Sequence, residues 1–291
     1  MMSHTPSGVM NLRILLSAIV GMIAISLGGA AGAATIPVSD NFDNDSTGNS
    51  APTSGGTTWA EDSQDAGDWT IADPTSGPNG TTGDHVYRVD YSSNTNTTTE
   101  VRSTGLSVPD HTSQDFSFRA DFTINASNLE NAEVARVGFR YQNTDSDLNG
   151  FPSGSGNTFF ELGTGELKVV DNESGSFNAA ISTNTLTVDT TGSTVYELVV
   201  NGTYLSGGDL DISATLSDGT TTLTAGQVLN APAGGENLGF TSLMRGNEED
   251  MTTPVTLQAD YDNFSVLIPE PATLALLGLG GAVMISGRRR R

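Results

Sequence analysis

Hydrophobic and polar residues alternate along much of the chain, most clearly between residues 115 and 124. The apolar positions of this segment are Phe116, Phe118, Ala120, Phe122 and Ile124. A period of two places successive side chains on opposite faces of a strand, so one face is buried and the other faces water. The same alternation over residues 133–141 and 209–216 predicts two more strands with one buried face.

Weaker alternation continues on both sides of these three segments. It predicts strands at residues 85–91, 98–102, 158–162, 166–170, 195–201, 238–244 and 255–266. Asn201-Gly202 and Asp218-Gly219 are dipeptides that favour tight turns between strands. No segment from residue 40 to 264 shows helical periodicity. A dozen or so strands in roughly 225 residues predict an all-β fold with two packed sheets, because one open sheet could not bury so many apolar faces.

The charge of the chain is strongly acidic. It contains 34 acidic and 12 basic residues, of which Glu270, Arg13 and Arg288 to Arg291 lie in the terminal segments. The body between these segments, residues 34–267, therefore carries 33 acidic and 7 basic residues, a net charge of −26. Such a surface repels nucleic acid and anionic lipid, so neither is expected as its partner. Without any cysteine, disulfides and thiolate metal sites are excluded.

The N-terminal segment predicts export. Arg13 precedes an apolar stretch from Ile14 to Leu27, and small residues follow. Ala31-Gly32-Ala33 fits the small-x-small cleavage rule, which predicts a signal peptide at residues 1–33 and cleavage between Ala33 and Ala34. A retained anchor helix is the alternative to a cleaved signal peptide. Met10 is an alternative start, because Met10-Asn11-Leu12-Arg13 is a more usual charged opening for a signal peptide.

The last two dozen residues combine three features. Pro269-Glu270-Pro271 favours an extended segment, because proline does not fit inside a helix. The apolar run Ala272 to Ser286 follows; as a helix it would extend about 22 Å, which is short for a bilayer core of about 30 Å. Four arginines, typical of a stop-transfer signal on the cytoplasmic side, close the chain: Arg288, Arg289, Arg290 and Arg291.

This three-part tail resembles the PEP-CTERM sorting signal of Gram-negative bacteria that make exopolysaccharide. The resemblance implies that residues 268–291 hold the exported protein transiently in the inner membrane until an exosortase cuts near the Pro-Glu-Pro motif. Exosortase is therefore the expected processing partner, and the cell surface or the extracellular matrix is the expected destination. A simple C-terminal anchor is the alternative.

Two short motifs open and close the body. They are Ser39-Asp40-Asn41-Phe42-Asp43 and Asp260-Tyr261-Asp262-Asn263-Phe264-Ser265-Val266. They resemble the two ends of concanavalin A-like jelly rolls of the LamG or glucanase type, in which the first and last strands are adjacent. The resemblance implies that residues 34–267 form an all-β, two-sheet antiparallel jelly-roll sandwich.

The sequence lacks the motifs of enzymes with this fold. Laminarinase-type jelly rolls carry Glu-x-Asp-x-x-Glu on one strand, where the acids act as nucleophile and general acid. The nearest approach here is Glu161 and Glu166, but two glycines between them predict a hairpin turn. His85 and His111 are not accompanied by a Gly-x-Ser-x-Gly elbow. We therefore expect no catalytic residue.

Acidic loops favour a structural calcium ion as the only cofactor. The segment from Asp145 to Gly150 matches the first half of a calcium loop, with oxygen ligands at Asp145, Asp147 and Asn149, but Gly156 stands where a bidentate Glu belongs. Asp43 to Gly48 has the same shape and the same gap, and an ordinary Asx-turn is the alternative for both loops. The jelly-roll resemblance implies a third site between the chain ends, with Asp40 or Asp43 and Asp260 or Asp262 as ligands.

Three of the seven basic residues of the body are candidates for glycan binding. Arg119, Arg136 and Arg140 lie on the polar faces of successive predicted strands. Their forked donors suit the carboxylate of an acidic sugar. The alternative is ion pairing across strands with Asp121 or Glu133.

These observations predict a secreted, non-enzymatic β-sandwich that is sorted by an exosortase and associates with exopolysaccharide. A glycoside hydrolase or lyase of the same fold is the first alternative. A structural matrix protein without any ligand is the second.

Overall fold

A computed structural model gives the fold of the body. It describes residues 35–40, 42, 60–64, 67–73, 85–93, 99–104, 106–107, 115–142, 156–173, 176–206, 209–229, 237–247 and 252–269. Ile36–Ile268 form one compact unit, which contains every described core residue from Phe42 to Val266. A unit with its own hydrophobic core has the defining property of a domain that folds independently. The predicted signal peptide and residues 270–291 lie outside the described residues.

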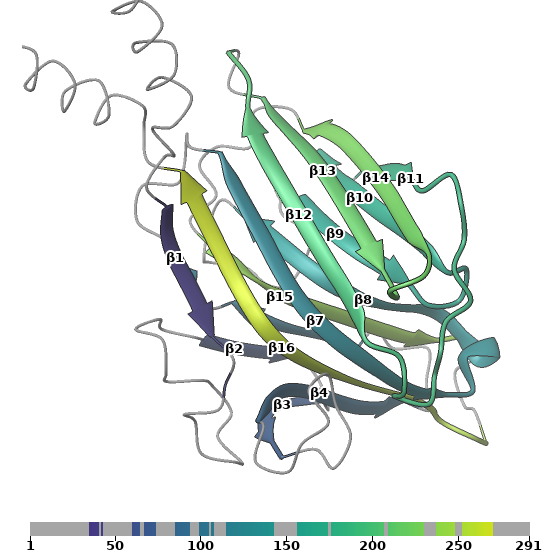
Figure 1. The fold of residues 1–291 in the computed structure, drawn as a ribbon. Helices are drawn as coiled ribbons and strands as arrows, with labels where there is room; N and C mark the ends of the chain where they lie inside the picture. Colours follow the sequence, from purple (N-terminus) through teal and green to yellow (C-terminus); the bar gives the residue numbers. More distant parts are fainter. Residues whose placement is uncertain are drawn as a thin grey trace, which may run out of the picture. The chain divides into compact units, whose positions relative to one another are not determined.

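The described residues form sixteen strands in two sheets of eight (Figure 1). Sheet A has the order β14-β13-β12-β7-β16-β4-β3, with β1 beside β16. Its strands are β1 (Thr35–Asp40), β3 (Gly67–Ala72), β4 (Val86–Ser93), β7 (Phe116–Ser127), β12 (Tyr196–Tyr204), β13 (Leu210–Ser217), β14 (Thr222–Leu229) and β16 (Val255–Pro269).

Sheet B has the order β11-β10-β9-β8-β15-β5-β2, with β6 beside β15. Its strands are β2 (Ala60–Gln64), β5 (Thr99–Thr104), β6 (Leu106–Ser107), β8 (Ala132–Gln142), β9 (Gly156–Glu161), β10 (Glu166–Glu173), β11 (Ser176–Ile181) and β15 (Asn237–Gly246). Every strand pair with a described register is antiparallel. The expected antiparallel two-sheet fold is confirmed, and so is the adjacency of the first and last strands.

The apolar face of each sheet packs against the other. Along β7 the residues Phe116, Phe118, Ala120 and Phe122 are buried, as the alternation predicted. Phe118 of sheet A meets Phe139 of sheet B with ring centroids 5.9 Å apart, and Tyr196 meets Phe160 at 5.7 Å. Burying one such ring stabilises a fold by about 1.5–3 kcal/mol, so these facing pairs hold the two sheets together.

The two terminal motifs of the body supply core aromatic residues. Phe42 from the opening motif packs against Tyr87, with centroids 5.6 Å apart. Tyr261 and Phe264 from the closing motif both pack against Phe240, at 4.3 and 5.1 Å. All three motif aromatics are buried. The motifs therefore anchor the first and last strands in the core.

The chain changes sheets between β7 and β8. Asn128 has a left-handed backbone (φ 57°) and donates a hydrogen bond to the carbonyl of Pro254. The 3-10 helix η1 (Leu129–Asn131) follows and is the only helix among the described residues. Because β7 belongs to sheet A and β8 to sheet B, side chains that point outward from these two strands lie on opposite surfaces of the sandwich.

One of the two predicted turns is wrong. Asn201-Gly202 lies inside β12, where a Cβ on Gly202 would stand 2.2 Å from the ring of Phe116. The glycine makes room for an aromatic ring from the neighbouring strand, a requirement that local sequence does not reveal. The turn at Asp218-Gly219 is confirmed: the Asp218 carboxylate accepts hydrogen bonds from the backbone of Thr220 and Thr221.

Candidate functional site

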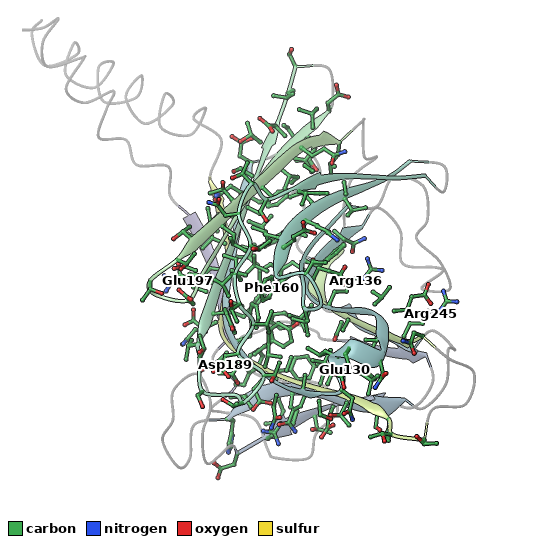
Figure 2. The ribbon with its side chains drawn as sticks, turned by 90° about the vertical axis from the view of Figure 1, so that its right-hand side faces the viewer. Glu130, Arg136, Phe160, Asp189, Glu197 and Arg245 are labelled. Atoms are coloured by element: carbon green, nitrogen blue, oxygen red, sulfur yellow. The ribbon has the colours of Figure 1, made fainter. Side chains whose placement is uncertain are left out.

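The structure separates the candidate arginines. Arg119 lies on the outer face of sheet A, where its guanidinium is 2.6 Å from the Glu197 carboxylate. Arg136 lies on the outer face of sheet B, and Figure 2 shows Glu197 and Arg136 on opposite sides of the core residue Phe160. The side chain of Arg140 is outside the described residues, but its position in β8 is on the same face as Arg136. The three arginines therefore do not form one site.

The expected ion-pair partners also differ. Arg119 pairs with Glu197 on β12, and Glu133 pairs with Arg245 on β15 at 2.9 Å. Asp121 instead accepts a hydrogen bond from the side-chain amide of Asn263. Ion pairs between strands exist as anticipated, but their partners come from strands distant in sequence.

Arg119 lies in an acidic hollow on the outer face of sheet A. The hollow measures about 570 Å³ and is lined by Arg119 together with Asp121, Glu197 and Asp218. Hydrogen bonds from the Thr221 and Thr220 backbone hold the pKa of Asp218 below its ordinary value. Three carboxylates outnumber one guanidinium, so this hollow does not attract an anionic ligand.

The outer face of sheet B has a second buried layer around β9. The first five residues of β9 are buried, although a sandwich strand with one solvated face alternates. Thr158 and Phe160 face the core between the sheets, whereas Asn157 and Phe159 face outward, yet they are only 2% and 3% exposed. The guanidinium of Arg136 lies over the Phe159 ring, 4.4 Å from its centroid.

Charged side chains continue this layer at the β9–β10 hairpin. Lys168, the only lysine of the chain, lies 3.6 Å from a Glu161 oxygen and 3.4 Å from a Glu166 oxygen. Thr164 donates a further hydrogen bond to Glu166. The two glutamates face each other in register across the hairpin, as the glycines between them predicted. Sheet B thus presents Arg136 and Lys168 beside an aromatic ring and an amide.

The chain-end acids on β16 already have protein partners. Asp260 is buried and accepts two hydrogen bonds from the Arg88 guanidinium, at 2.6 and 2.7 Å. The hydrogen bonds that Arg88 donates to Asp260 raise the pKa of Arg88. Asp262 is fully buried and accepts a hydrogen bond from the backbone of Asn263. A calcium ion at the chain ends would have to compete with Arg88 for Asp260.

The remaining candidate calcium ligands lie outside the described residues. These are Asp43, Asp145, Asp147 and Asn149, together with the side chain of Asp40. Among the residues that the structure does describe, no three His, Asp or Glu side chains are grouped to hold a metal ion. Calcium binding stays a prediction.

Sequence reasoning missed Asn157, Phe159 and Lys168 as members of one surface. The available signal was Phe159-Phe160, because two consecutive large apolar residues in a strand place one on each face. Which outward-facing residues become buried depends on neighbouring strands, and the sequence does not specify those neighbours.

Comparison with known proteins identifies the tail. Residues 267–291 match the family model of the PEP-CTERM protein-sorting motif. The strand β16 ends at Pro269, so the motif begins within the last strand of the body. No helix within the described part of the chain is long and apolar enough to span a membrane. No curated protein matches the chain in sequence.

Solved structures identify the fold of the body. Lectin I from Ulex europaeus, in complex with the methyl glycoside of α-L-fucose, is 13% identical, with a TM-score of 0.50 over 80% of this chain and 98% of the lectin. This likeness shows that the body has a concanavalin A-like jelly-roll fold.

Two further solved structures match with lower TM-scores. The PL-14 alginate lyase from Aplysia kurodai is 12% identical, with a TM-score of 0.47 over 68% of this chain and 87% of the lyase. The winged bean acidic lectin, complexed with methyl-α-D-galactose, is 12% identical, with a TM-score of 0.46 over 80% of this chain and 98% of the lectin.

Proposed function

We propose that this chain is an exported, exosortase-processed protein of the cell surface or extracellular matrix, and that its body binds exopolysaccharide without catalysis. One observation carries the proposal: a single chain joins a PEP-CTERM sorting motif to a jelly-roll body similar in fold to a lectin that was solved in complex with a fucose glycoside. The motif sorts the exported protein to the cell surface or matrix, and the body supplies the contact with carbohydrate.

The outer face of sheet B is the better candidate surface for an acidic glycan. Arg136 and Lys168 supply positive charge there, and Phe159 supplies an aromatic ring. Glu161 and Glu166 contact Lys168 and balance these two cations, so this face is a locally neutral exception in a body of net charge −26. The forked donors of Arg136 suit a carboxylated sugar there. The three carboxylates around Arg119 make the outer face of sheet A unsuitable for the same ligand.

A glycan array with the purified body, residues 34–268, tests the binding proposal. We expect binding to polyuronates, with Arg136→Gln weakening it and Arg119→Gln leaving it unchanged. The two variants remove the same charge from opposite surfaces, so each is the control of the other. Binding to no glycan on the array would refute the proposal and favour a structural matrix protein without any ligand.

The sorting proposal is tested in cells by replacing Pro269-Glu270-Pro271 with three alanines. Mass spectrometry of the C-terminus should show that the tail is retained, because the exosortase recognises the motif. Replacing Arg288 to Arg291 with asparagine should release unprocessed chains, because the stop-transfer charge is lost. Unchanged tail removal in the alanine variant would contradict exosortase processing.

A second candidate function has a specific place in the structure. Glu161 and Glu166 face each other on the outer side of sheet B, and paired carboxylates are the groups that glycoside hydrolases use. Both contact Lys168, which favours an ion-pair cluster over a catalytic pair. Release of reducing ends from a polysaccharide by the purified body, abolished by Glu161→Gln or Glu166→Gln, would establish the enzyme instead.

A further inference from the structure

The side chain of Asn157 is buried on the outer face of sheet B without a hydrogen-bond partner. It is 2% exposed, and neither its amide oxygen nor its amide nitrogen is hydrogen-bonded to any part of the described structure. Buried side-chain amides are nearly always paired, because an unpaired donor or acceptor loses its water without a replacement. A buried amide with both groups unpaired therefore indicates a partner outside the described residues, and a bound ligand is such a partner.

The surroundings of Asn157 define the chemistry of that partner. Asn157 lies two residues from Phe159 on the same face of β9, a spacing of about 6.6–6.8 Å along a strand. The Arg136 guanidinium lies over Phe159, and Lys168 is opposite Phe159 on β10. An apolar wall is provided by Val170, which is opposite Asn157, buried, and outside the core between the sheets.

We propose that Asn157 is the hydroxyl-recognising residue of a uronate-binding site on the outer face of sheet B. The amide places a donor and an acceptor side by side, and two neighbouring sugar hydroxyls match this pair because each hydroxyl donates and accepts. The carboxylate of the same sugar then lies toward Arg136, whose forked donors bind it. This inference rests on the proposed carbohydrate-binding function and names the residue that selects the ligand.

A structural role and a ligand-binding role for Asn157 predict opposite effects of Asn157→Leu on the stability of the ligand-free protein. If protein groups satisfied the amide, its replacement by leucine would remove hydrogen bonds and destabilise the body. If the amide is unpaired, Asn157→Leu removes a desolvated polar group and keeps the side-chain shape. The melting temperature of the ligand-free body should then rise by about 2–4 °C.

The test measures binding and stability on the purified body, residues 34–268. The probes are a polyuronate oligosaccharide and the same oligosaccharide with its carboxylates reduced to hydroxymethyl groups. We expect Asn157→Leu to weaken binding of both probes by about tenfold, because two neutral hydrogen bonds are lost. Arg136→Gln should weaken binding of the carboxylated probe only. Asn201→Leu, at an exposed position of sheet A, is the matched control and should change neither affinity.

Each outcome decides the inference. A raised melting temperature together with weakened binding in Asn157→Leu supports it. Wild-type affinity in this variant, or a lowered melting temperature, overturns the site but leaves the proposed function intact, because the wild-type body still binds the glycan. Absence of binding by the wild-type body to either probe and to the glycan array overturns both.

Discussion

Among single residues, Asp260 and Arg88 form the best-defined charged contact of the body. Asp260 is 4% exposed, and its carboxylate accepts hydrogen bonds from the Arg88 guanidinium through both oxygens. A buried ion pair adds little net stability, but removing one partner leaves the other charge buried and unpaired. Asp260 lies directly opposite Arg88 in the register of β16 against β4, so the pair joins these two strands.

Replacing Asp260 by alanine should destabilise the body by on the order of 3 kcal/mol, because Arg88 loses its counter-charge. Urea unfolding in the presence of EDTA measures this and separates the ion pair from any bound metal. Asp211→Asn, at an exposed position on β13 of the same sheet, is the control and should cost less than about 0.5 kcal/mol. The double variant Arg88→Met/Asp260→Leu should recover most of the loss; no recovery would contradict the ion-pair interpretation.

Asp189 gives the body an acid-sensitive loop. Its carboxylate accepts hydrogen bonds from the side chain and backbone of Thr191 and from the side chain of Thr194, which lower its pKa to about 2. Because this folded-state pKa lies below the ordinary value of 3.8, the stabilisation is complete above pH 3.8 and is lost as the pH falls toward 2.

Asp189→Ala should lower stability at neutral pH and flatten its decline between about pH 4 and pH 2, because the titrating group is gone. Thermal unfolding over a pH series measures the effect. Thr194→Val removes one of the hydrogen bonds to Asp189, so it should cause a smaller loss of stability at neutral pH than Asp189→Ala. If the stability of Asp189→Ala fell between pH 4 and pH 2 as steeply as that of the wild type, the protonation of Asp189 would not be linked to folding.

Among elements, the β9–β10 hairpin depends on one glycine. Gly165 has a φ of 68°, and a Cβ there would stand 2.0 Å from the carbonyl oxygen of Leu186. The backbone N–H of Leu186 donates a hydrogen bond to the Gly165 carbonyl, and the N–H of Gly165 donates one to the backbone carbonyl of Glu161. The hairpin positions Glu161, Glu166 and Lys168 on the outer face of sheet B, so its geometry controls the candidate site.

Gly165→Ala should destabilise the body by at least about 2 kcal/mol, because the left-handed backbone and the contact with Leu186 both reject a Cβ. Gly163→Ala is the matched control in the same turn: nothing lies within 4 Å of its Cβ, so stability should change by less than about 0.5 kcal/mol. Chemical unfolding compares the two variants. Equal stability of the two variants would mean that the turn changes its backbone conformation to accommodate a Cβ at residue 165.

For the body as a whole, charge is the dominant property. A net charge of −26 repels itself in the compact state, and a cation bound only by the folded protein would relieve this repulsion locally. A ligand at a hundredfold excess over its Kd stabilises a protein by about 2.7 kcal/mol. The acidic loops thus favour a structural calcium ion, which stays a proposal for Asp145, Asp147 and Asn149 and for the chain-end pair of Asp40 or Asp43 with Asp262.

Calcium should raise the melting temperature of the body by about 5–10 °C, well beyond the effect of magnesium at equal concentration, because the strict octahedral geometry of magnesium does not fit these loops. Asp145→Ala or Asp262→Ala should remove much of the difference, whereas the exposed Asp211→Ala should not. Equal shifts with both ions would mean that calcium only screens charge.

The sequence by itself determined the all-β class, ten of the sixteen described strands, the sandwich, the acidic surface and the sorting motif, whereas β1, β2, β3, β6, β11 and β14 were not predicted. These properties are local: alternation over a few residues places Phe116, Phe118 and Phe122 on one face wherever the strand lies, and Pro269-Glu270-Pro271 is recognised without any tertiary contact. The hairpin at Gly163 and Gly165 was equally readable, because turn chemistry depends on neighbouring residues.

Only the tertiary structure decided which residues share a surface. Arg88 and Asp260 are 172 positions apart in the chain, and the sequence around either residue does not identify the other as its partner. Arg119 and Arg136 are close in sequence, yet they face opposite sides because the chain crosses between sheets after β7. The burial of Asn157 depends on what covers the outer face of β9. Strand order and sheet assignment are set by long-range pairing, so every candidate site assembled across strands required the fold.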